Sequence, residues 1–345
     1  MAAGVSALWS AYRMRLKRRR LLLRAIRSRH QLDVVVDRTA TIPPGQILAF
    51  TTLRNEMQRL PHFLEHYRNL GIGHFLMVAN DCSDGTQEFL TEQPDVSLWR
   101  TDASYKASRF GVDWLNWLQF RFGNAKWCLT VDVDEILIYP HWQTRDLHAL
   151  TARLELSGAN ALGAMMLDLY PKGPLGAGTY SAGQEPTELL NWFDPSPYRA
   201  TRQMPMQNLW LQGGARERMF FADCPERGPT LNKLPLVKWN RRFAYANSTH
   251  SALPPKLNLE WSGPKAISGD ARLSGVLLHT KFLPDIVERS QEEKQRGQHF
   301  GQPDQHDAYY DGVVGAPDMW YDHAVLYQGW KQLCALGLMS TGEWN

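Results

Sequence analysis

The pattern of apolar and polar positions after residue 45 alternates between two periods. Short apolar runs bounded by turn residues predict buried strands, and apolar positions three or four residues apart predict helices. The strands predicted in this way lie at 46–52, 74–78, 96–99 and 127–131, and the helices at 57–69, 86–92 and 110–122. Strands that alternate with helices predict an α/β fold, with a mostly parallel sheet and helices on both faces.

The pattern becomes less regular after residue 134. The elements predicted there are helices at 147–156, 284–297 and 321–336, and strands at 161–169, 204–211, 234–239 and 275–279. Residues 171–197 are rich in Gly, Pro and Ser. A segment of this length without regular structure is typical of a loop that covers a site.

The composition indicates a globular protein. The chain has 345 residues, of which 43% are hydrophobic, so it can bury one large core or two smaller ones. Its four cysteines form no C-x-x-C pair, which argues against a disulfide framework and a structural zinc site. No stretch approaches the roughly 18 apolar residues that span a bilayer, and no signal peptide is evident. We therefore expect a cytoplasmic protein.

The net charge of +3 hides an asymmetry. Nine Lys or Arg and no acidic residue lie between Arg13 and Arg29, so the rest of the chain is mildly acidic. Leucines are interleaved with this charge, as in a helix that rests on an anionic membrane surface, here the inner face of the membrane. A solvated leader without a partner is the alternative. Nucleic acid is not expected as a partner, because the chain carries no recognisable nucleic-acid-binding module.

Three acidic residues follow the apolar strand at 127–131. They are Asp132, Asp134 and Glu135. Acids at the carboxyl edge of a buried parallel strand lie where open α/β sheets bind ligands. Hard cations such as Mg²⁺ or Mn²⁺ accept one or two carboxylates and leave other positions to phosphate oxygens and water. The pattern therefore favours a metal and a nucleotide diphosphate, although a solvated acidic turn has the same local sequence.

Polar turns also follow the first two predicted strands. Arg54, Asn55 and Glu56 end the first strand, and residues 80–86 end the second. Helix capping explains such residues locally. The sharper hypothesis is that Asp84 accepts the imide N–H of uracil with support from neighbouring Asn80 or Asp81, because both turns and the acids would share one edge of the sheet.

Four motifs occur in order along this part of the chain. They are Arg54-Asn55-Glu56, then His66-Tyr67-Arg68 with Leu70-Gly71, then Asn80-Asp81 with Ser83-Asp84-Gly85-Thr86, and finally Trp127 to Glu135 with its acidic end. Together they resemble the bacterial glycosyltransferase family 2-like proteins. The resemblance is strong over residues 47–139 and looser to residue 300, through 213–218, 233–238 and 277–281.

The resemblance implies a GT-A fold and transfer of a sugar from a nucleotide sugar, helped by Mn²⁺ or Mg²⁺. It implies that Asp84 contacts the base and that Asp132 contacts the ribose or the metal. Asp134 is then the direct metal ligand. His279, at the end of a late strand, corresponds to a further metal or diphosphate ligand, and His250 is the competing histidine.

The remaining site candidates are charged groups in the second part of the chain. Lys281 is favoured for neutralising the departing diphosphate because it lies close to His279 in sequence. The alternatives for that role are Arg216, Arg218 and Lys238. An inverting transfer also needs a carboxylate that takes the proton of the acceptor hydroxyl. Asp168 and Glu217 are both candidates for this base.

We therefore expect a metal-dependent, inverting, hexosyltransferase-like enzyme of surface-polysaccharide or glycolipid assembly, with a UDP-sugar donor and a glycan or lipid-linked acceptor. The alternatives are a nucleotidyltransferase and a non-catalytic, membrane-associated nucleotide-sugar-binding protein. A nucleotidyltransferase would be expected to have a Gly-rich basic loop where this chain has Arg54-Asn55-Glu56. The expected organisation is a basic leader at 1–45, a nucleotide-sugar-binding half at 46–140, an acceptor and catalytic half at 141–300 and a helical tail at 301–345.

Overall fold

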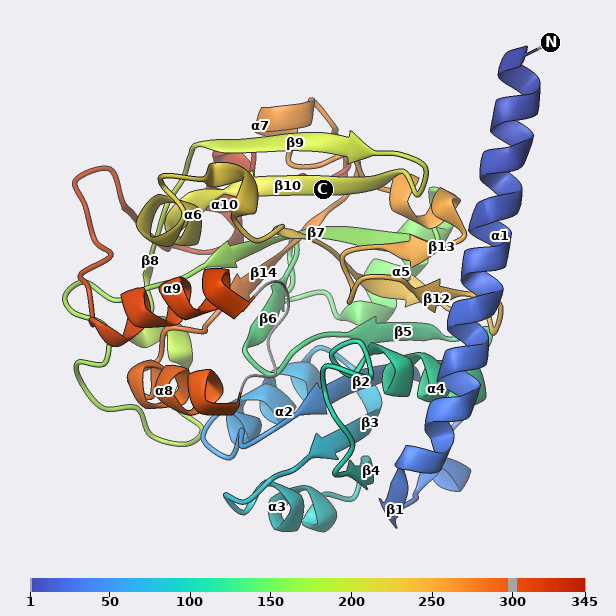
Figure 1. The fold of residues 1–345 in the computed structure, drawn as a ribbon, viewed down its shortest axis with the longest axis horizontal. Helices are drawn as coiled ribbons and strands as arrows, with labels where there is room; N and C mark the ends of the chain where they lie inside the picture. The colour runs from blue at the N-terminus through green and yellow to red at the C-terminus, as the bar shows by residue number, and fades with distance from the viewer. Residues whose placement is uncertain (1, 297–302, 345) are drawn as a thin grey trace.

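A nine-stranded sheet runs through the centre of the molecule (Figure 1). The structure is a computed structural model that describes residues 2–296 and 303–344. In spatial order the strands are β1 (Asp33–Val36), β4 (Val96–Thr101), β3 (Ile72–Asn80), β2 (Ile47–Leu53), β5 (Trp127–Thr130), β11 (Asn232–Lys238), β7 (Ala161–Asp168), β14 (Gly275–His279) and β6 (Glu135–Ile138). Strands from both parts of the sequence therefore share one sheet.

The sheet is mostly parallel. Strands β2, β3, β4, β5, β7 and β14 point the same way, and β1, β6 and β11 run opposite to them. The central strands are apolar and buried on both faces, as expected for parallel strands covered by helices. This arrangement confirms the predicted α/β fold class with a mostly parallel sheet.

Helices cover both faces of the sheet. On one face, α2 (Leu60–Asn69), α3 (Thr86–Glu92) and α5 (Leu147–Leu156) contribute their leucines and aromatic residues to one hydrophobic cluster. On the other face, α4 (Val112–Phe122) packs with Val112, Trp114 and Leu118 into a second cluster. These helices and strands lie close to their predicted positions because each carries a clear local period.

The later part of the chain differs more from the prediction. A hairpin of β9 (Tyr198–Gln203) and β10 (Asn208–Gly213) leads into α6 (Gly214–Phe220), so the strand predicted at 204–211 begins and ends later. Of the helix predicted at 321–336, only residues 330–335 are helical. Strand β15 (Val325–Leu326) pairs with β8 (Trp192–Phe193) instead, and Gly329, with φ +102°, begins the short helix α10 (Trp330–Ala335).

Two further helices lie near the edge of the sheet where the parallel strands end. They are α8 (Ile286–Arg296) and α9 (Pro303–Val314), which pack against each other. The predicted end of the first of these helices at Gly297, and the domain boundary expected after residue 300, fall outside the described residues.

The acidic residues lie on a segment that crosses the edge of the sheet. After β5 the chain passes through residues 131–134, which we call the acidic crossing, and enters β6 at the far margin of the sheet. Strand β6 runs antiparallel to β14, with Glu135 opposite His279. Along the way the Asp134 carbonyl accepts a hydrogen bond from Thr280 N, at 2.8 Å. The crossing therefore passes directly over the strand ends that form the candidate site.

Residues 2–28 of the basic leader form one long helix, α1 (Ala2–Ser28), along the side of the molecule (Figure 1), whereas residues 33–36 of the leader form β1 of the central sheet. Helix α1 packs against α4 and β12 (Ala244–Tyr245). Its Arg24 pairs with Asp113 of α4 at 2.9 Å. No helix within the described residues is long and apolar enough to cross a membrane.

Candidate functional site

A cavity of about 700 Å³ opens at the edge where the parallel strands end. Its lining includes Arg54 after β2, Asn80 at the end of β3, Asp132 and Asp134 after β5, and His279 at the end of β14. Parallel strands bring their carboxyl ends together, so residues far apart in sequence meet here. The volume lies within the roughly 300–1,000 Å³ that is typical of small-molecule sites.

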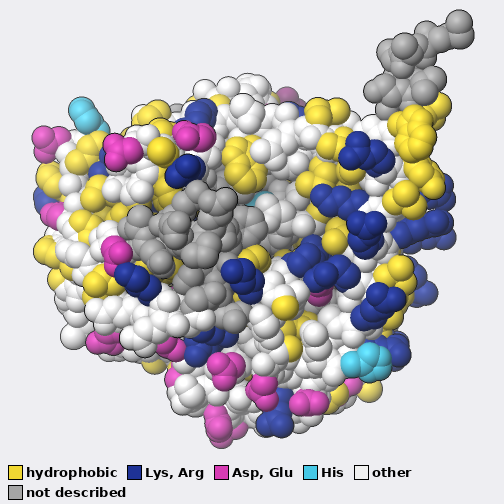
Figure 2. Space-filling view, viewed as in Figure 1, with side chains coloured by type: hydrophobic (Ala, Val, Ile, Leu, Met, Phe, Trp, Pro, Cys, Tyr) yellow, Lys and Arg dark blue, Asp and Glu magenta, His cyan; other side chains and the backbone are white. Residues whose placement is uncertain are grey.

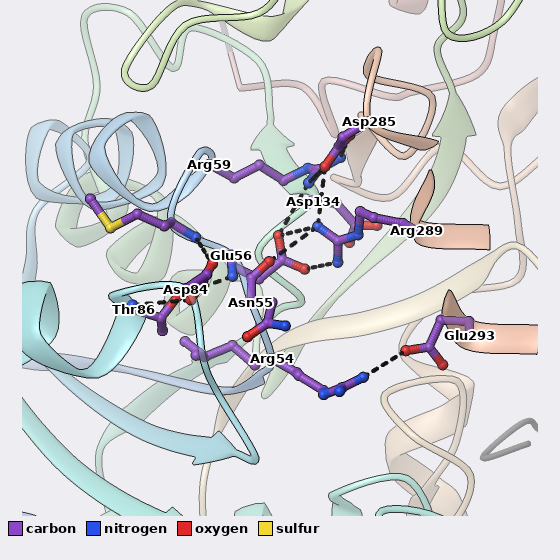
Figure 3. A network of polar contacts seen from close by, with 12 residues as sticks. Arg54, Asn55, Glu56, Arg59, Asp84, Thr86, Asp134, Asp285, Arg289 and Glu293 are labelled. Carbon is purple, nitrogen blue, oxygen red and sulfur yellow. Dashed lines mark hydrogen bonds and ion pairs between the residues drawn. The ribbon is translucent and has the colours of Figure 1, made fainter. Parts of the chain in front are cut away.

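The turns after β2 and β3 are cross-linked by short polar side chains (Figure 3). The Asp84 carboxylate accepts hydrogen bonds from the backbone N–H groups of Met57, at 3.0 Å, and Thr86, at 3.1 Å. Asn55 accepts one from Ser83 N at 2.8 Å. Asn55 and Asp81 have positive φ angles of 50° and 55°, which Asn and Asp tolerate better than most residues. These residues thus hold the two turns in register with each other.

A charged network joins these turns to α8 (Figure 3). Glu56 contacts Arg289 through both carboxylate oxygens and Arg59 at 3.3 Å. Arg59 in turn makes two 3.0 Å hydrogen bonds to Asp285. Burial alone lowers the pKa of Arg289, but Glu56 outweighs it and raises the pKa. The network fixes two arginines at the wall of the cavity.

Lys233 neutralises one side of the acidic crossing. Its ammonium group lies 2.8 Å from Glu135 and 3.2 Å from Asp132, and its side chain is only 4% exposed. Burial raises the pKa of Glu135, with Lys233 opposing that rise. The Asp132 side chain remains 52% exposed and faces the cavity. Glu135 therefore serves as a buried anchor, and Asp132 stays accessible to a ligand.

Asp134 belongs to a second, more buried chain of charges. His279 Nε2 lies 3.2 Å from Asp134, and Nδ1 lies 2.6 Å from Asp168. The other oxygen of Asp168 accepts a 2.8 Å hydrogen bond from Arg216. Burial favours neutral groups here, but the opposite charges prevail. They lower the pKa of Asp134, hold that of Asp168 at about 2 and raise that of His279.

The donor set at this point fits a divalent cation. Asp134 and His279 face each other across the cavity wall, and a carboxylate on Nδ1 is how proteins orient a metal-binding imidazole. Binding a cation would displace the Nε2 proton of His279, since a ligating imidazole is neutral. Within residues 2–296 and 303–344, no three His, Cys, Asp or Glu side chains already converge on one point as a metal site. The remaining ligands would come from diphosphate oxygens and water.

The structure brings some of the predicted residues to the cavity and leaves others outside it. Those in the lining are Arg54, Glu56, Asp132, Asp134, His279 and Lys281. Those outside the described lining are Asn55, Asp81, Asp84, Asp168 and Glu217. The ammonium group of Lys281 lies 5.6 Å from the ring centre of Tyr309.

The two proposed catalytic bases are both held by arginines. Asp168 lies beneath His279, and each of its carboxylate oxygens has a partner. Glu217 of α6 pairs with Arg199 of β9 at 2.5 Å. Another carboxylate, Glu226, does line the cavity and is exposed.

The alternative cations for the diphosphate also separate in space. Lys238 lies at the opposite end of β11 from Lys233 and pairs with Glu155 at 2.9 Å. Arg218 is paired with Asp194 at 2.8 Å and does not line the cavity. Arg216 does line it, although its Nε is bound to Asp168.

Sequence reasoning missed several residues that line the cavity. Lys233, Arg289 and Arg296 all contribute positive charge there, and Arg296 donates to Asn80 at 3.1 Å. The only available signal was composition, because α8 was visible as a charged helix. His250, the competing histidine, also lines the cavity, and its Nδ1 lies 2.7 Å from the Asn232 carbonyl.

Comparisons with known proteins add little to this geometry. No protein-family model matches the sequence, and no curated protein matches it. Solved structures with some likeness include a 4-diphosphocytidyl-2C-methyl-D-erythritol synthase, with 17% identity, TM-score 0.24, and coverage of 41% of this chain and 68% of that one. A UDP-glucose pyrophosphorylase complexed with UDP-glucose has 9% identity, TM-score 0.25, and coverage of 78% and 86%.

A third structure is a Bacillus anthracis protein assigned as a glucose-1-phosphate thymidylyltransferase, in complex with sucrose. It has 9% identity and a TM-score of 0.27, and the match covers 78% of this chain and 84% of that one.

Proposed function

We propose that this chain is a transferase that uses a nucleoside-diphosphate sugar as donor, with a divalent cation as cofactor. The finer proposal is an inverting glycosyltransferase related to the glycosyltransferase family 2-like proteins, acting on a glycan or lipid-linked acceptor. The observation that carries it is the juxtaposition of Asp132, Asp134 and His279 with several cations in one cavity at the carboxyl edge of the sheet. Carboxylates for a cation and arginines for phosphates together match a metal-bound diphosphate.

The residues of the cavity have separate roles in this proposal. Asp134 and His279 hold the cation, and Asp132 stands beside them for the ribose or the metal. The cation, when bound, supplies positive charge next to the diphosphate. Lys281, Arg289 and other cations of the lining stabilise the negative charge that develops on the departing diphosphate.

Asp168 acts as a positioning residue in this proposal, because both of its oxygens are engaged by His279 and Arg216. The base that takes the proton of the acceptor hydroxyl must lie within reach of the substrate. Glu226 meets that requirement of position, since it lines the cavity and is exposed.

Product analysis with UDP-sugars and Mn²⁺ tests this proposal. A glycosyltransferase releases UDP, and slow transfer of the sugar to water gives the same product without a known acceptor. A nucleotidyltransferase would instead need added pyrophosphate and would form UTP and a sugar 1-phosphate. UDP release that requires Mn²⁺ supports the proposal, and UTP formed only with pyrophosphate favours the alternative activity.

Asp134→Ala is the decisive variant for the cation. In the wild type, we expect calorimetry to show that Mn²⁺ increases the affinity for UDP. In the variant, the factor by which Mn²⁺ increases this affinity should be smaller by about tenfold or more, since one cation ligand is removed. Asp33→Ala is the matched control, because Asp33 is exposed and lies on β1, far from the cavity lining. If Asp134→Ala kept the full Mn²⁺ dependence, the assigned cation site would be wrong.

A further inference from the structure

Helix α1 has two apolar stripes on different faces. The inner stripe consists of Met14, Leu21 and Ala25, which are buried, and Ser28 follows on the same line. Residues three, four or seven apart lie on one face of a helix, so this spacing is what a single docked face requires. This stripe packs against α4, against Ala244 of β12 and against Leu253 of β13 (Ala252–Leu253).

The second stripe faces away from the body. It consists of Trp9, Tyr12, Leu16 and Leu23, whose exposed fractions are 62%, 53%, 42% and 55%. These positions are again three, four and seven apart, and on a helical wheel they lie opposite the inner stripe. No described residue covers them. The outer stripe is therefore a continuous apolar face of a folded helix that is exposed to water. Single exposed leucines are common on protein surfaces, but a continuous apolar face is not.

Cations flank the outer stripe from Arg13 onward. Exposed arginines of this helix include Arg13, Arg15, Arg19, Arg20 and Arg27, and residues 2–28 contain no acidic residue. Partial burial and the like charges of Arg15, Arg242 and Arg19 lower the pKa of Arg18. Figure 2 shows the Lys and Arg side chains gathered on this side of the molecule. The positive charge around the stripe is thus crowded and lacks compensating acids within the helix.

We propose that the outer face of α1 binds the surface of an anionic lipid bilayer, with the outer stripe at the boundary between the headgroups and the acyl chains and the arginines on the lipid phosphates. Aromatic and leucine side chains between cations are the features of a helix that lies in the membrane interface. A second copy of the chain fits less well, because two helices with only positive charge repel each other. Nucleic acid would use the arginines and leave the stripe exposed.

The docked inner face makes this surface part of the folded body. Arg24 of α1 pairs with Asp113, and Asp113 also pairs with Arg109, which lines the cavity. The membrane-bound helix would therefore hold the cavity at a fixed place relative to the lipid surface. This inference does not depend on which reaction the cavity performs.

Vesicle co-sedimentation with the full chain tests the proposal. We expect binding to vesicles that contain phosphatidylglycerol, little binding to pure phosphatidylcholine, and weaker binding as salt rises. The double variant Leu16→Ser/Leu23→Ser should weaken binding to anionic vesicles by about tenfold or more, because both side chains enter the interface. It should fold normally by circular dichroism, since neither side chain is in the core.

The matched control is Leu156→Ser, which changes a leucine that is 83% exposed at the end of α5. It should bind vesicles like the wild type. Equal binding by the double variant and the wild type would overturn the proposal. So would a dimer, seen by sedimentation velocity, that the double variant dissociates, or tighter binding to a labelled RNA than to the vesicles.

Discussion

Two carboxylates that flank opposite ends of the cavity, without belonging to its described lining, are held in different ways. At the end formed by β2 and β3, exposed Asp84 accepts hydrogen bonds from two backbone N–H groups of nearby turns. At the end formed by β7 and β14, Asp168 is buried and accepts from the side chains of His279 and Arg216. The first carboxylate keeps its contact with water, and the second depends wholly on its partners.

This difference separates an adaptable end from a fixed one. An exposed carboxylate can exchange a hydrogen bond from the protein for one from a ligand at a small cost in free energy, because water can hydrogen-bond to the carboxylate during the exchange. A buried carboxylate is stable only while opposite charges stay beside it. We infer that the β2–β3 end can adjust to a ligand, and that the β7–β14 end supplies a rigid arrangement of charges.

The largest effect is expected from Arg216→Met at the fixed end. The change leaves the Asp168 carboxylate buried with only His279 beside it. Breaking a buried ion pair in this way should lower the free energy of unfolding by about 3–5 kcal/mol, measured by urea denaturation. Arg199→Met is the control, since Arg199 is 46% exposed, and it should cost at most about 1 kcal/mol. Similar losses in the two variants would show that the ends do not differ as described.

An acid dependence of stability is expected next, from a histidine that is bound to Asn232 of β11. Burial and nearby Lys233 lower the pKa of His250 to about 3, below its ordinary value of 6.5. Between pH 6.5 and 3, His250 is therefore protonated in the unfolded chain but neutral in the folded chain. The free energy of unfolding consequently falls as the pH drops from 6.5 toward 3. His250→Asn keeps a side-chain N–H for the Asn232 carbonyl but cannot titrate.

Urea denaturation at pH 7 and pH 5 measures this effect. The loss of unfolding free energy between the two values should be about 1–2 kcal/mol smaller in His250→Asn than in the wild type. An equal loss in both proteins would mean that His250 takes up its proton in the folded state as easily as in the unfolded one.

The smallest effect is expected from Asp84→Asn at the adaptable end. The amide group cannot accept from both Met57 N and Thr86 N, so stability should fall by about 1 kcal/mol. Asp81→Asn, an exposed change in the same turn, should stay within about 0.5 kcal/mol. If Asp84 also contacts uracil, UDP affinity by calorimetry should fall by roughly 1–3 kcal/mol, and unchanged affinity would remove that role.

The adaptable end was predictable from sequence because its signals are local. Residues 54–56 follow β2 and residues 81–86 follow β3, and both strands are recognisable in the sequence. The direction of parallel strands then places all of them at one edge. Nothing beyond the period of each segment was needed for this part of the fold.

Asp168, Arg216 and His279 were all candidates from the sequence, but their contacts with one another at the fixed end were not predictable, because the three residues come from distant segments. Arg216 is 48 residues from Asp168, and His279 is 111 residues from it. Lys233 was not predicted as a site residue for a different reason. Strand β11 runs opposite to its neighbours, so its first residues, and not its last, reach the cavity. The direction of a strand depends on how it pairs with its neighbours in the sheet, so it cannot be predicted from a short apolar run of residues alone.

The acidic crossing has a consequence for how this chain can be divided. It carries the polypeptide from β5 to β6 at the far margin, while β11 is inserted between β5 and β7. A split gene or a protease cut near residue 140 would therefore leave each fragment with strands whose neighbours belong to the other. New chain ends made by circular permutation belong instead in an exposed loop such as residues 176–179. The segment that presents Asp132 and Asp134 also brings β6 of the first half of the sequence beside β14 of the second half, so neither half has a complete sheet alone.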